Sequence, residues 1–145
     1  MNEALHHIRK AYFNRLNGAI TSGGSTVPVY NMIPIDATFP FIKISSISVN
    51  ETDQNRDSFN TLSETRIEVV TAFQGDSGGE LQCNQIVDEV LNLIRTRSSG
   101  YIDLSSDNFN VYSTTLDQIK YVEEHLDDRS YFRAIIEIQN KVEKL

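Results

Sequence analysis

The order of helical and extended patterns is the feature that most constrains how this 145-residue chain can fold. Residues 2–20 and 80–97 repeat apolar side chains at helical spacing, so we expect an amphipathic helix in each range. Alternating or β-branched residues predict four main strands, at residues 39–49, 65–73, 109–122 and 131–142. This order predicts a single α+β domain, residues 1–145, with two helices packed on one mainly antiparallel β-sheet.

Polar or small residues separate the predicted elements. Residues 50–62 are expected to form an exposed loop, residues 123–129 a hairpin connection, and residues 22–25 a flexible turn. A short extended piece at residues 27–32 contains Pro28 and precedes Pro34, so it is expected at an edge of the sheet. The alternation in residues 39–49 changes parity, which indicates a β-bulge near Ser45 and Ser46 or burial on both faces.

Composition narrows the classes of function. Thirteen Lys and Arg against twenty Asp and Glu give a net charge of -7, which argues against sequence-independent binding of nucleic acid. Cys83 is the single cysteine, so an intramolecular disulfide and a cysteine-based metal cluster are excluded, and we expect this side chain in the core. No apolar run is long enough to span a membrane, and residues 1–13 lack a signal-peptide pattern, so we expect the protein to fold inside the cell.

Residues 75–79 (GDSGG) match the residues around the nucleophile of chymotrypsin-like serine proteases. A hydrolase using Ser77 would need a histidine base, and the candidates are His6, His7 and His125. The string leads directly into the predicted helix at residues 80–97, which favours a tight turn in which Asp76 or Ser77 helps to cap that helix. The same turn could hold a phosphate, but it lacks the Gly-Lys-Ser/Thr ending of a P-loop. We therefore predict no catalytic residue, and a hydrolase using Ser77 remains an alternative.

The remaining polar clusters do not predict a metal or cofactor site. His6 and His7 are adjacent on the first predicted helix, where neighbouring side chains diverge and do not readily chelate one ion. His6, Arg9, Lys10 and Arg15 form a small basic cluster that could contact DNA or an acidic partner, or lie beside acidic neighbours of its own chain.

The spacing of several segments along nearly the whole chain carries a resemblance to a known family. These segments, in order, are Val29-Tyr30 with Pro34, Phe39-Pro40-Phe41-Ile42, Glu64 to Val69, the helix end Val90 to Ile94, Tyr112 to Leu116, and Tyr131 to Ile138. Taken together, they resemble the tail-completion proteins of long-tailed bacteriophages, which are the tail terminators or head–tail joining proteins found between the tail tube and the head connector.

The resemblance implies a virion protein that acts by binding, without catalysis or a cofactor. Such proteins form a ring, usually a hexamer, that caps the tail tube, ends its polymerisation and offers a joining surface to the head connector, while DNA passes through the lumen. They are assembled in the host cytoplasm. A neck or connector component on the head side is an alternative, and a small ligand-binding domain is another. The exposed candidates for contacts with neighbours or with the tube come from the two polar stretches and are Glu51, Asp53, Arg56, Asp57, Phe59, His125, Asp127 and Arg129.

Overall fold

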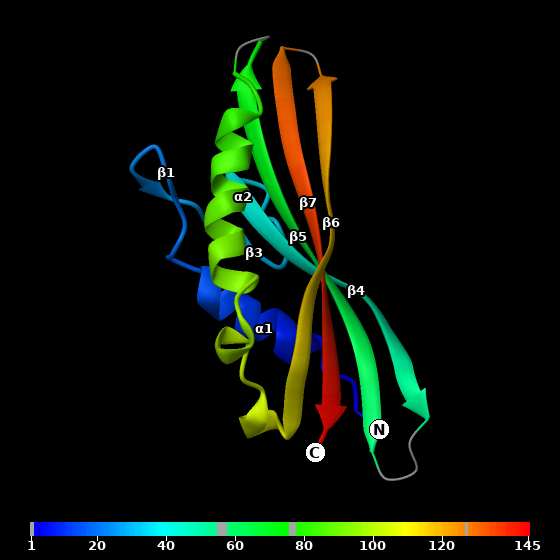
Figure 1. Ribbon diagram of the computed structural model, residues 1–145. Helices are drawn as coiled ribbons and strands as arrows, with labels where there is room; N and C mark the ends of the chain where they lie inside the picture. Colours follow the sequence, from blue (N-terminus) through cyan, green and yellow to red (C-terminus); the bar gives the residue numbers. More distant parts are fainter. Residues whose placement is uncertain (1, 55–57, 76–77, 127) are drawn as a thin grey trace.

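The computed structural model describes residues 2–54, 58–75, 78–126 and 128–145, which form a five-stranded sheet with two α-helices on one face (Figure 1). The sheet order is β3-β4-β5-β7-β6, and every neighbouring pair is antiparallel except β3 with β4. The predicted α+β class and mainly antiparallel sheet are confirmed. The elements of the sheet and its helical cover are α1 (Leu5–Leu16), β3 (Val29–Tyr30), β4 (Phe41–Gln54), β5 (Phe59–Gln74), α2 (Leu81–Ile94), β6 (Phe109–Leu126) and β7 (Arg129–Lys144).

The core lies between the sheet and the two helices. Alternation along β5 and β7 places Ile67, Val69, Ile136 and Ile138 on the helix-facing side, where each is fully buried, as predicted. Cys83 of α2 is also buried, as predicted, and burial raises the pKa of its thiol to about 11. A dry apolar layer of this kind supplies the main driving force for folding.

A band of buried polar side chains continues the core toward the end of the sheet where β5 begins. The Tyr12 hydroxyl and the Thr114 hydroxyl both donate to Asn140 Oδ1, each over 2.9 Å. Ser63, which pairs with Asn140 across the strands, and Thr65 are buried beside them. Within the described residues, Ser63 Oγ, Thr65 Oγ1 and Asn140 Nδ2 are buried without a hydrogen-bond partner. This band costs stability that the apolar core must offset.

The strands are longer than predicted, and this corrects the expected loops. The predicted loop at residues 50–62 is wrong for most of its length, because β4 runs to Gln54 and β5 starts at Phe59. The predicted connection at residues 123–129 is likewise mostly strand, because β6 runs to Leu126 and β7 starts at Arg129. In both places, backbone pairing across the ladder continues through polar sequence.

Other boundaries shift by smaller amounts. α1 ends at Leu16 and α2 at Ile94, earlier than the periodicity predicted. The predicted flexible turn at residues 22–25 is a short hairpin, β1 (Thr21–Ser22) paired with β2 (Ser25–Thr26). Two 3-10 turns, η1 (Ser98–Gly100) and η2 (Ser105–Asp107), connect α2 to β6.

Two causes were expected for the change of alternation in residues 39–49, and the structure shows both of them in β4. A register shift lies between Ser46 and Ser48, so the predicted bulge is confirmed. Phe41 and Ile42 are also both buried although they point to opposite faces, which confirms burial on both sides of β4 near its start. Among the described residues, neither α-helix has the length and apolar composition needed to cross a bilayer.

Candidate interaction surface

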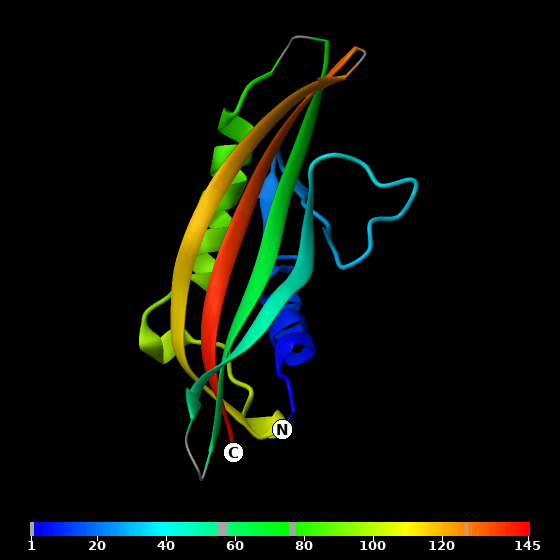
Figure 2. The same cartoon turned by 90° about the vertical axis from the view of Figure 1, so that its right-hand side faces the viewer.

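The most exposed apolar side chains of the described chain gather in one connection. Residues 31–38, here called the arm, join β3 to β4, and Figure 2 shows this segment extending sideways beyond the β4 edge of the sheet. Met32 is 85% exposed, Ile35 is fully exposed, and Ile33 between them is also exposed. Apolar residues gathered on a projecting segment are typical of a surface that binds another macromolecule.

Both ends of the arm are held against the sheet. At its start, Tyr30 lies in β3 beside β4, with its ring 6.1 Å from that of Phe41. At its end, the Phe39 ring lies 5.1 Å from Phe41 and 5.6 Å from Tyr131, and the Phe39–Pro40 peptide bond is cis. Within the arm, the Ala37 amide donates to the Pro34 carbonyl over 3.2 Å. The arm is therefore anchored by aromatic contacts while its apolar residues face solvent.

A basic helix lies beside the arm. α1 carries His6, His7, Arg9, Lys10 and Arg15 and no Asp or Glu. The side chains of His6, Arg9 and Lys10 line a hollow of about 210 Å³ that also reaches Asn31 at the start of the arm. Arg9 is fixed there by a 2.9 Å hydrogen bond to Ser46 of β4. The predicted basic cluster is thus divided, because Arg15 points instead to the Leu93 carbonyl of α2.

The second helix, α2, carries acidic residues instead. α2 carries Asp88 and Glu89 and no Lys, Arg or His, and Glu80 precedes its first residue. Beside Glu80, a hollow of about 150 Å³ opens at the β6 edge; its lining, here called the acceptor face, is Glu80, Tyr121, Val122, Glu123, Phe132 and Arg133. Tyr121 is 42% exposed there. Among the described residues, β6 pairs with β7 alone, so its other edge is open.

Three carboxylates meet on the neighbouring strands β5, β6 and β7, where oxygens of Glu64, Asp117 and Glu137 lie within 4.8 Å of one another. Gln118 Nε2 donates to Glu137 over 3.0 Å, and Arg66 lies 3.2 Å from the same carboxylate. The hydrogen bond from Gln118, followed by Arg66, lowers the pKa of Glu137. Burial, followed by Asp117, raises the pKa of Glu64. The cluster is therefore a polar network on three strands that contains one ion pair, between Arg66 and Glu137.

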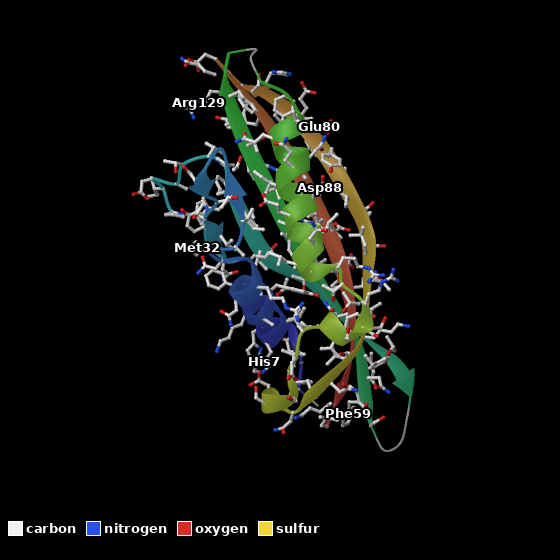
Figure 3. All side chains as sticks on the ribbon, turned by 60° about the vertical axis from the view of Figure 1, so that its left-hand side comes forward. His7, Met32, Phe59, Glu80, Asp88 and Arg129 are labelled. Atoms are coloured by element: carbon white, nitrogen blue, oxygen red, sulfur yellow. The ribbon has the colours of Figure 1, made fainter. Side chains whose placement is uncertain are left out.

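The predicted contact residues divide between the two ends of the sheet and do not form one site. Figure 3 shows Phe59 at one end and Arg129 at the other. Phe59 is 46% exposed, and Glu51 is exposed on β4. Arg129 is exposed near the arm, where it lines a hollow of about 480 Å³ together with Ala37 and Phe39. Arg56, Asp57 and Asp127 lie outside the described residues, as does the side chain of Asp53, whose backbone belongs to β4.

His125 takes part in a structural array at the β6–β7 turn. Its Nε2 lies 2.7 Å from Glu123 Oε1, and its Nδ1 lies 2.9 Å from Ser130 Oγ. Ser130 is buried, and its hydroxyl donates to the Gly75 carbonyl over 2.6 Å. The arrangement of Ser130, His125 and Glu123 resembles a Ser-His-Glu triad, but the serine proton points away from the histidine. The array ties the start of β7 to the end of β5.

The residues of the predicted protease-like string serve the turn before α2, as far as they are described. The Gly75 amide donates to the Asp128 carbonyl, and Gly78 has a positive φ of 83° beside the Phe73 ring. Glu80 is the N-cap of α2 and makes no side-chain capping hydrogen bond. Asp76 and Ser77, the proposed capping or catalytic residues, lie outside the described residues.

The arm is the part of the surface that sequence reasoning missed. Its apolar residues Met32, Ile33 and Ile35 stand between Pro28 and Pro40, where neither helical nor alternating periodicity places them in a core. That mismatch was the available signal, because apolar residues without a periodic partner are candidates for intermolecular burial.

The sequence matches no protein-family model, and no curated protein matches it significantly.

Proposed function

We propose that this chain is a tail-completion protein of a long-tailed bacteriophage, which forms a ring on the tail tube, ends its polymerisation and offers the joining surface to the head connector. The proposal rests on the segment-by-segment resemblance described above. The single structural observation that carries it is the anchored, solvent-facing arm on one side of the sheet combined with an open β6 edge on the other. A ring subunit needs two such unlike surfaces.

The arrangement of polar groups also favours a binding role. The titratable groups that cluster in the described residues, namely the carboxylates with Arg66 and the array around His125, bond to neighbours within their own clusters. The net charge of -7 suits a ring through which DNA must pass without adhering to the wall. In this role the partners are further copies of the chain, the tail tube protein and the head connector.

Native mass spectrometry over a range of protein concentrations tests ring formation. We expect one discrete assembly, most simply six copies of the 16.4 kDa chain. A broad ladder of oligomers without a closed species would contradict a ring-forming role. The head-side neck component is distinguished by whether the protein binds isolated tail tubes or isolated connectors.

A further inference from the structure

We propose that the arm of one copy seats on the acceptor face of the next copy, so that copies associate head to tail. This contact rests on the proposed ring-forming function and names the surfaces that would close the ring. The occupant of the acceptor face is thus a second copy of this chain.

The register of the sheet places the two surfaces at the same height on opposite edges. Phe41, at the base of the arm, pairs with Val70 of β5, and Val70 pairs with Arg133 of β7. Arg133 in turn pairs with Val122 of β6, which lines the acceptor face. A single row of residues therefore runs from the arm to the acceptor face. If a neighbouring copy lies edge to edge with the first copy, with the strands of the two copies roughly side by side, the arm of the neighbour reaches the acceptor-face end of this row in the first copy.

Charge favours the same placement. Both helices cover one face of the sheet, α1 across β4 and β5 and α2 across β5 and β7. In an edge-to-edge neighbour, the basic α1 of one copy approaches the acidic α2 and Glu80 of the next. If two identical edges met instead, the contact would place two basic helices or two acidic helices beside each other. Complementary charge of this kind sets orientation and partner choice more than affinity.

Apolar exposure supplies the attraction. Met32 and Ile35 are exposed in the described part of their own chain, and the acceptor face presents Tyr121 and a hollow partly lined by Phe132. Because the arm and the acceptor face are different surfaces, each copy can bind one neighbour on each side. Such a heterologous contact produces a ring when its rotation closes.

The first test uses one variant on each side of the contact. The arm variant combines Met32→Asp with Ile35→Asp, and the acceptor variant is Tyr121→Asp. We expect each to raise the dissociation constant for self-association about tenfold or more, because a charge replaces an apolar group at the centre of the contact. Leu145→Asp is the matched control: this residue is 66% exposed at the chain terminus, away from both surfaces, and its substitution is expected to leave association unchanged.

Mixing the two variants tests the head-to-tail arrangement. Each variant keeps one intact surface, so an equimolar mixture should form a dimer containing one copy of each, at concentrations where neither variant associates alone. Sedimentation velocity and native mass spectrometry read this directly. If the mixture stays monomeric, or if either variant alone forms the wild-type assembly, the contact is wrong.

Two further measurements show whether a negative result means that the contact is wrong. One checks that each variant folds, and the other examines the association and tube binding of the wild-type chain. Each variant is compared with the wild type by thermal unfolding, and Glu123→Lys replaces Tyr121→Asp if the latter does not fold. A wild-type chain that stays monomeric up to about 1 mM overturns the contact. A wild-type chain that associates through these surfaces but does not bind tail tubes upholds the contact and refutes the tail-completion role.

Discussion

Gly78 illustrates how a single backbone position fixes the turn between β5 and α2. Its φ of 83° lies in the left-handed region, and a Cβ added there would overlap the Phe73 side chain. Both features require glycine, one through backbone conformation and the other through space. The last but one residue of the protease-like string, Gly78, thus has a structural reason to be glycine.

We expect Gly78→Ala to lower the free energy of unfolding by about 1 to 3 kcal/mol, because the new methyl group meets both backbone strain and the Phe73 ring. Gly79→Ala is the matched control, since a Cβ at that position has no neighbour within 4 Å. Urea unfolding of the two variants measures the difference. Equal stability of both variants would show that the Phe73 contact does not constrain this turn.

Tyr12 is one of the residues of the buried polar band. Its hydroxyl donates to Asn140, and burial raises its pKa to about 12 from the ordinary value of 10.0. Because the folded-state pKa lies above the unfolded one, the contribution of the protonated hydroxyl is complete below pH 10 and is lost as the pH rises through 12.

Tyr12→Phe should therefore lower stability at neutral pH by about 0.5 to 1.5 kcal/mol, through loss of the hydrogen bond. It should also flatten the decline of stability between pH 10 and 12 relative to the wild type. Tyr112→Phe, which alters an exposed tyrosine, is the control and should change neither. Chemical denaturation across this pH range checks both effects; parallel pH curves for wild type and Tyr12→Phe would contradict the assignment.

At the scale of elements, the network on β5, β6 and β7 contains two carboxylates with opposite responses to pH. The pKa of Glu64 is raised, so its favourable contribution is present below pH 4.5 and is lost as the pH rises through its folded-state pKa. The pKa of Glu137 is lowered, so its contribution is present above pH 4.5 and is lost as the pH falls through its folded-state pKa.

The paired substitutions Glu64→Gln and Glu137→Gln should consequently act in opposite directions at pH 7. The first removes an unfavourable charge and stabilises the fold, and the second removes the partner of Gln118 and Arg66 and destabilises it. Each effect is expected to stay below about 1 kcal/mol because water screens the partly exposed groups. Thermal unfolding at pH 7 and at pH 4 measures both; a shift of the same sign for both variants at pH 7 would contradict the network described.

The helices and strands also show which parts of the fold the sequence could predict. The periodicity of α2 and the alternation of Ile67 and Val69 predicted the helix-facing side of the sheet, because apolar spacing reports burial against a layer. The strand ends at residues 50–54 and 123–126 were missed because backbone pairing sustains them there through mainly polar sequence, in which the one apolar residue, Leu126, is exposed. The exposure of Met32 and Ile35 was missed for a different reason: the path of residues 31–38 depends on the contacts of Phe39 with Tyr131, far away in the sequence.

The whole molecule has two unlike sides joined by one sheet. The arm and the basic α1 lie toward the β4 edge, and α2, Glu80 and the open β6 strand lie toward the other. Of the predicted contact residues, Phe59 lies at one end of the strands and Arg129 at the other (Figure 3), and Arg129 also lines the hollow beside the arm. In an edge-to-edge ring the two strand ends would face the tube and the connector. The proposed role thus assigns the edges of the sheet to neighbouring copies and the strand ends to the other parts of the virion.

The most direct measurement of this role is the length distribution of tail tubes grown from the tube protein of the same phage, with and without this chain, by electron microscopy. We predict that the chain stops elongation and leaves a ring of density at one tube end, and that the arm variant with Met32→Asp and Ile35→Asp does neither. Tubes that keep growing in the presence of the wild-type chain, with bare ends, would contradict the proposed function.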